Sequence, residues 1–140
     1  GAAIFLRAEA QFFGAAQPAA PQDTLPPADR AALAKLNDAM GDGEAWRPEG
    51  LTIGSLADQV GVPEHRLRRL INDHLGERNF ASYVNARRID AAKRVLRDPA
   101  RAQDSVSAIA FDLGFASLGP FNRAFKEATG QTPSEWRKQG

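Results

Sequence analysis

Cysteine is absent from the 140-residue sequence, which excludes disulfide bonds and thiolate metal sites. Apolar runs such as Ile4–Leu6 and Phe12–Phe13 are short, far below the roughly 20 residues that cross a bilayer. The sequence also lacks paired carboxylates, a nucleophile with a base, and a glycine-rich phosphate loop at workable spacing. We therefore expect neither an enzyme nor a segment that spans a membrane by itself.

Histidine is scarce, which bears on metal binding. The two histidines, His65 and His74, are nine residues apart and have no cysteine or carboxylate companions at metal-ligand spacing. We predict no metal site and no cofactor.

Charge is nearly balanced overall, at a net +1, but it is unevenly distributed. Residues 1–62 carry 4 basic and 8 acidic side chains, residues 63–97 carry 9 and 4, and residues 98–140 carry 5 and 5. One segment therefore holds the basic excess, so that one face can approach phosphates while another carries the opposite charge. A solvated helix surface explains the charge alone equally well.

Proline and glycine divide the chain into two parts. Residues 14–28 are rich in Ala, Pro and Gln, which predicts an extended linker. We interpret residues 1–28 as a stub and linker to an absent upstream domain, and residues 29–140 as the folded domain. The apolar stub Ile4–Phe13 can alternatively be the tail of a membrane segment.

From Asp29 onward the periodicity is helical, and no alternating run is long enough for a strand. We predict an all-α fold with seven helices, in which two helix-turn-helix units flank a long linker helix. Trp46 is expected to fill the core. The expected helices are one marked by Leu33, Leu36 and Met40, one capped by Thr52 and ending at Val60, and Pro63–Leu75, Phe80–Arg97, Ser105–Leu113, Ser117–Thr129 and Pro133–Lys138.

The most specific feature is an internal repeat with an offset of 53 residues. The first part of the repeat aligns Leu56, Ala57, Val60, Gly61 and Val62 with Ile109, Ala110, Leu113, Gly114 and Phe115. With one more residue of offset, the second part aligns Leu67, Arg69, Leu70, Ile71 and Gly76 with Phe121, Arg123, Ala124, Phe125 and Gly130. Small alanines permit a close helix crossing, and the glycines suit a corner with positive φ. The repeat predicts two helix-turn-helix units, at about 29–76 and 104–138.

The helix predicted over 63–75 has a polar face opposite its Leu67, Leu70 and Ile71 stripe. That face carries His65, Arg68, Arg69 and Asn72. Arginine can donate two hydrogen bonds to guanine, and Asn or His can add a contact, which is the chemistry of major-groove reading. We predict that these four residues contact bases and that Thr52 and Arg66 contact phosphates.

The equivalent helix, 117–129, has little hydrogen-bonding capacity in its first turn. We predict that Leu118, Asn122 and Arg123 contact bases, with Leu118 against a thymine methyl, and that Ser117 and Lys126 contact phosphates. The first unit is then expected to discriminate sequence, while the second mainly positions the protein.

The linker helix, predicted over 80–97, would be about 27 Å long and would hold two reading helices near one DNA repeat apart. Its charge comes mostly from Arg87, Arg88, Lys93, Arg94 and Arg97. We expect some of these side chains to face phosphate and the others to be solvated.

The chain from Asp29 to Lys138 resembles the DNA-binding domain of AraC/XylS transcription regulators. The match rests on Ile109, Ala110, Gly114, Phe115, Phe121, Arg123, Phe125, Lys126, Gly130, Thr132, Pro133 and Arg137, with Trp136 in place of the family's Tyr or Phe. The resemblance implies seven helices and monomeric engagement of two successive major-groove segments. Gly119 and Pro120 depart from the polar pair usual in the family, which weakens the case for base reading by the second helix.

Taken together, these features predict sequence-specific binding to double-stranded DNA at a promoter operator. The resemblance adds RNA polymerase as a candidate partner, and an effector or dimerisation partner acting through an upstream domain. The expected location is the cytoplasm, at the nucleoid, with a possible membrane tether through the N-terminal part. The alternative that we weigh is a protein-interaction module whose basic helices bind an acidic partner.

Overall fold

The computed structural model describes residues 25–140, and this part of the chain contains α-helices and no strand. The predicted stub and most of the predicted linker therefore lie outside the described residues. The helices are α1 (Pro27–Met40), α2 (Ile53–Val60), α3 (Glu64–Arg69), α4 (Phe80–Val95), α5 (Val106–Asp112), α6 (Leu118–Thr129) and α7 (Pro133–Lys138). The predicted all-α fold with seven helices is confirmed for this part of the chain.

Local sequence signals set most of the helix ends. Thr52 caps α2: its side chain accepts the Ser55 N–H, while the Ser55 side chain accepts the Thr52 N–H. Thr132 and Glu135 form the same reciprocal arrangement at α7. Proline stands in the first turn of α1, where its missing N–H costs nothing, so this helix begins at Pro27, two residues before the expected start.

The helix expected over 63–75 is two segments. α3 ends at Arg69, and Leu70–His74 continue as a wider π-helical turn, closed by the Leu75 N–H on the Leu70 carbonyl at 2.9 Å. Three residues of this turn, Leu70, Ile71 and His74, are buried. An apolar period alone does not distinguish the two windings, because both keep one side against the core.

The linker helix is shorter than predicted: α4 has 16 residues and ends at Val95 rather than Arg97. Asp98 competes with continuation of the helix, since its side chain accepts the Ala100 N–H and caps a short 3-10 turn over Pro99–Arg101. The 16 residues of α4 then span about 24 Å at 1.5 Å per residue.

The two helix-turn-helix units repeat at the level of burial and backbone. Ala57 of α2 and Ala110 of α5, the small residues at equivalent positions of the repeat, are both buried. Gly61 and Gly114 both turn the chain with positive φ, at 81° and 97°. The repeat read from the sequence therefore corresponds to a duplicated corner.

The core runs through both units and the face of α4 between them. Trp46 is buried, as predicted, among residues of the first unit. In the second unit Phe115, Phe121, Phe125 and Trp136 form a chain of tilted rings with centroids 5.1 to 5.8 Å apart. Such aromatic pairs add to area burial, so α5, α6 and α7 form one packed body.

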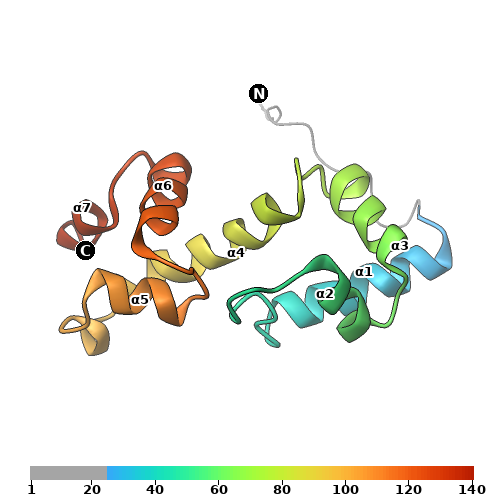
Figure 1. Ribbon diagram of the computed structural model, residues 1–140, viewed down its shortest axis with the longest axis horizontal. Helices are drawn as coiled ribbons and strands as arrows, with labels where there is room; N and C mark the ends of the chain where they lie inside the picture. Colours follow the sequence, from blue (N-terminus) through green and yellow to red (C-terminus); the bar gives the residue numbers. More distant parts are fainter. Residues whose placement is uncertain (1–24) are drawn as a thin grey trace, which may run out of the picture.

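Figure 1 shows α4 as a rod between the two units, with α3 at one end and α6 at the other. In this view α6 lies above its end of the rod and α3 lies beside the other end, and both stand higher than α1, α2 and α5. In each unit the second helix therefore lies on the upper side of the first helix in this view.

Candidate nucleic-acid interface

The first unit presents a polar surface on α3 and the π-helical turn that follows it. His65, Arg68, Arg69 and Asn72 are all exposed, while Leu67, Leu70 and Ile71 are buried beneath them. The amphipathic face predicted from the sequence is present, and the four predicted base-contacting residues share it.

These side chains differ in how far they are already engaged. Arg68 donates to the Glu64 carboxylate at 2.7 Å, one helical turn away, with both side chains about half exposed. Arg69 has no such partner among residues 25–140 and lies beside Asp73 at the edge of a hollow. Its guanidinium is therefore the more available of the two for a ligand.

Arg66 and Thr52, the predicted phosphate contacts of the first unit, both have structural partners. Arg66 donates to Asp29 at 2.9 Å and so ties α3 to α1, with its side chain 31% exposed. The Thr52 hydroxyl accepts the Ser55 N–H at 3.0 Å, although the residue itself is exposed. Each would contact phosphate with a group that also stabilises the fold.

The second unit presents α6. Phe121 and Phe125 anchor it from below and are fully buried, while Asn122, Arg123 and Lys126 are exposed on the outer side. Leu118, at 37% exposure, is one of the few large apolar side chains left at the surface among the described residues. Ser117 stands at the N-cap with its hydroxyl not used as a cap, which leaves it available.

Gly119 shapes this second surface. A Cβ atom at this position would lie 3.5 Å from Nη1 of Arg123, so the guanidinium rests over the first turn of α6. The glycine that departs from the family pattern thus sits under the arginine that matches it. Arg123 has no ion pair in the described part of the chain.

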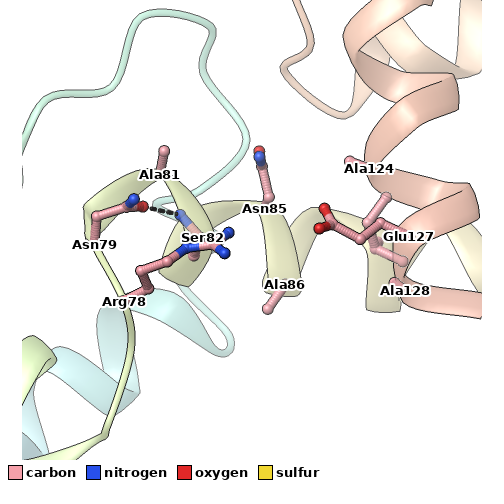
Figure 2. Close-up of a pocket in the computed structure, with 10 residues that line it drawn as sticks. Arg78, Asn79, Ala81, Ser82, Asn85, Ala86, Ala124, Glu127 and Ala128 are labelled. Carbon is pink, nitrogen blue, oxygen red and sulfur yellow. Dashed lines mark hydrogen bonds between the residues drawn. The ribbon is translucent and has the colours of Figure 1, made fainter.

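A hollow of about 360 Å³ opens between α4 and α6. Figure 2 shows Arg78, Asn79, Ser82 and Asn85 on the α4 side, with Asn79 accepting the Ser82 N–H, and Glu127 reaching from α6 toward α4. Sequence reasoning placed none of these in the interface. Arg78 belongs to the basic segment 63–97, but it lies between two predicted helices, where periodicity gives no face.

The expectation for the basic residues of the linker helix was wrong for Arg88. Arg88 is buried, at 9% exposure, and donates to the carbonyls of Trp46 and Pro48 at 2.8 and 3.0 Å. Arg97 lies over the Trp136 ring, 3.8 Å from its centroid. The sequence carried a signal for Arg88, because Val84, Arg88 and Ala92 are four residues apart and share the buried side of the helix.

Residues 56–139, from α2 to α7, match the family described as helix-turn-helix domain. A crystal structure of a transcriptional regulator with an AraC-type DNA-binding domain, from Chromobacterium violaceum, has a TM-score of 0.65 at 29% identity and covers 77% of this chain and 93% of its own. The chain belongs to the AraC-type helix-turn-helix family. Its resemblance to AraC/XylS regulators, inferred from the sequence, is confirmed.

Other AraC-type relatives agree. The C-terminal domain of AraT, a response regulator from Geobacillus stearothermophilus, has a TM-score of 0.63 at 25% identity and covers 83% of this chain and 88% of its own. The probable transcription factor PqrA of Proteus vulgaris is 32% identical over 94 residues, which is 67% of this chain and 74% of PqrA. The family is one of DNA-binding transcription regulators and not a class of enzymes.

Some relatives are much longer than this chain. Uncharacterized HTH-type transcriptional regulators of Staphylococcus aureus are 34% identical over 89 residues, which is 64% of this chain but only 11% of those proteins. The AraC-type domain therefore spans about a tenth of the length of these relatives. Among residues 25–140, no helix is both long and apolar enough to cross a membrane.

Proposed function

We propose that this AraC-type domain binds one DNA duplex with both units, α3 reading one major-groove segment and α6 the next. The observation that carries the proposal is that α3 and α6 stand at opposite ends of α4, each on the upper side of its unit's first helix (Figure 1), and that each helix has exposed polar residues. Because a recognition helix enters the major groove with its outer face, two such faces can engage one duplex.

The first unit supplies most of the base readout. Arg69, free of partners among residues 25–140, donates two hydrogen bonds to the O6 and N7 of a guanine. His65 and Asn72 add single contacts, and Arg68 joins them when it exchanges Glu64 for a base or a phosphate. Arg66 and Thr52 contact the phosphates that border this groove.

The second unit contributes position more than discrimination. Leu118 contacts a thymine methyl, and Arg123, with Asn122, reaches base edges from the first two turns of α6. Ser117 and Lys126 hold phosphates, the former beside the unpaired N–H groups of the helix N-terminus. Arg78 adds a positive charge in the hollow between the units, opposite Glu127.

The relatives reported above are described as transcription regulators, which favours DNA over the acidic protein partner considered from the sequence. Within a whole regulator this domain would act at a promoter operator, in the cytoplasm at the nucleoid. Contact with RNA polymerase, and control by an effector or by dimerisation through an upstream domain, would be properties of that larger protein.

Selection from a random duplex pool with the full 140-residue chain tests the proposal. We expect a preferred sequence with two recognisable segments, bound more tightly than random competitor at physiological salt, with an affinity that falls steeply as salt rises. Enrichment of no sequence, together with equal affinity for random duplex, would contradict it. Tight binding to an acidic polypeptide and none to duplex DNA would favour the interaction module instead.

A further inference from the structure

The two units meet directly, beside the α4 rod that joins them in sequence. The loop after α1, residues 44–50, belongs to the first unit, and the corner after α5, residues 113–115, belongs to the second. At their meeting point lies Arg88 of α4. A Cβ atom at Gly114 would be 2.2 Å from the Arg47 carbonyl oxygen and 2.9 Å from Nε of Arg88, so these backbones and the guanidinium are packed without spare room.

Arg88 holds this junction through hydrogen bonds to main-chain groups. Its Nε donates to the Trp46 carbonyl at 2.8 Å and its Nη2 donates to the Pro48 carbonyl at 3.0 Å, while its guanidinium lies 5.6 Å from the Phe115 ring centroid. The residue thus contacts both units from the helix between them. No carboxylate within 4 Å pairs with it among the described residues.

A buried guanidinium without a carboxylate is costly, and the burial lowers the pKa of Arg88 from its usual range. The hydrogen bonds of the planar guanidinium offset this desolvation cost only when its donors point at acceptors. Such a residue is sensitive to the position of the loop it holds, because a small rotation of the first unit would remove the acceptors.

A second arginine crosses the junction from the opposite side. Nη1 of Arg47 donates to the Asp112 carbonyl oxygen at 2.9 Å and lies 3.3 Å from the Asp112 carboxylate, and Arg101 lies 3.5 Å from the same carboxylate. Arg47 of the first unit therefore binds the end of α5, while Arg88 of α4 binds the loop of the first unit. Glu44, also paired with Arg47, fixes the near end of this contact.

We propose that Arg88, Arg47 and the Gly114 corner form an inter-unit clamp that sets the angle between α3 and α6, and with it the half-site spacing that the domain accepts. The clamp rests on the proposed function for its DNA consequence. A straight helix alone would leave bending of the rod and rotation of each unit about its ends free. The clamp removes both, so the domain approaches DNA as one rigid body.

The absence of cysteine makes a direct test simple. Spin labels can be attached at Lys35→Cys in α1 and Ser134→Cys in α7, which are exposed positions in different units. Pulsed electron paramagnetic resonance then measures the distance between the two units. The parent should give one narrow distribution. Arg88→Met, which keeps an apolar stem and removes the donors, should broaden or shift it while each unit stays folded. An unchanged distribution in a folded Arg88→Met protein would overturn the clamp.

A companion variant guards against misfolding. If Arg88→Met proves unfolded by circular dichroism, Arg47→Ala carries the test, because that side chain is 36% exposed and is much less buried than Arg88. The matched control is Arg94→Ala, an exposed arginine of α4 whose side chain donates to the Asp90 carbonyl of its own helix. It should leave the distribution as in the parent, and broadening by Arg94→Ala would show that any change to α4 has this effect.

The DNA readout uses the preferred duplex with one or two base pairs inserted between its segments. We expect the parent to lose about tenfold or more in affinity on insertion, and the Arg88→Met protein to lose only about two- to threefold from its own lower starting value. Equal insertion penalties would contradict the clamp. If the parent binds no DNA, the proposed function fails while the label distances still decide the clamp.

Discussion

Gly114 lies so close to Arg47 that any other residue type at position 114 would force the backbone to shift, since a Cβ atom there would lie 2.2 Å from the Arg47 carbonyl oxygen. Gly61, the equivalent corner of the first unit, also has a positive φ but has nothing within 4 Å of such an atom. Gly61 is therefore required only by its positive φ, whereas Gly114 is required both by its positive φ and by the close approach of Arg47.

Alanine substitutions at these two glycines should separate the cost of the positive φ from the cost of the steric collision. Gly61→Ala is expected to cost about 1 to 2 kcal/mol of stability from the positive φ alone. Gly114→Ala should cost about 1 to 3 kcal/mol more, because the methyl group also displaces the inter-unit contact. Urea denaturation of both variants measures the difference. Equal losses would show that the collision is relieved at no cost.

Arginine substitutions should reveal how the two units divide the reading of DNA. Arg69→Ala is expected to cost about 1 to 3 kcal/mol on the preferred duplex and to relax discrimination at one base pair. Arg123→Ala should weaken binding with less effect on preference. Competition titrations against single-base variants measure both, with Lys35→Ala, which removes an exposed positive charge from α1, as the control. A greater loss of preference at Arg123 than at Arg69 would reverse the assignment.

Gly119 offers a substitution that should be favourable. It lies in the first turn of α6 with helical backbone, and a Cβ atom would make only an ordinary 3.5 Å contact with Arg123. Gly119→Ala should therefore raise stability by up to about 1 kcal/mol through lower chain entropy in the unfolded state. Thermal denaturation checks this, with Gly130→Ala, at φ +80°, as the control expected to lose stability. A loss at Gly119 would mean that Arg123 needs the open surface.

The capping box of α7 should give a pH-dependent contribution. The Thr132 N–H donates to the Glu135 carboxylate at 2.8 Å, and this bond, with the Thr132 hydroxyl, lowers the pKa of Glu135 below its ordinary value. Because the folded pKa is the lower one, the stabilisation is present above the unfolded pKa and is lost as the pH falls through the folded pKa. Thr132→Ala keeps the main-chain N–H and removes only the hydroxyl, the smaller of the two causes, so it should raise the pKa of Glu135 part of the way back, as a carboxyl NMR titration would show. An unmoved titration would exclude the Thr132 hydroxyl as a cause of the lowered pKa.

The duplicated corners were predictable because their signals are local: small residues at a crossing, a glycine with positive φ, and apolar anchors at helical spacing. The polar faces of α3 and α6 followed from the same periodicity. Arg88 was not predictable as a clamp, because its acceptors are carbonyls some forty residues away in a loop. The π-helical turn and the early end of α4 depend on tertiary packing and on competition from Asp98, which periodicity does not report.

Hydroxyl-radical footprinting of the 140-residue chain on its preferred duplex tests the central claim most directly. A monomer that reads two successive grooves should protect two segments on one face of the duplex, about 10 base pairs apart, and Arg69→Ala and Arg123→Ala should each weaken a different segment. Protection of a single segment, unchanged in position by either variant, would contradict the account.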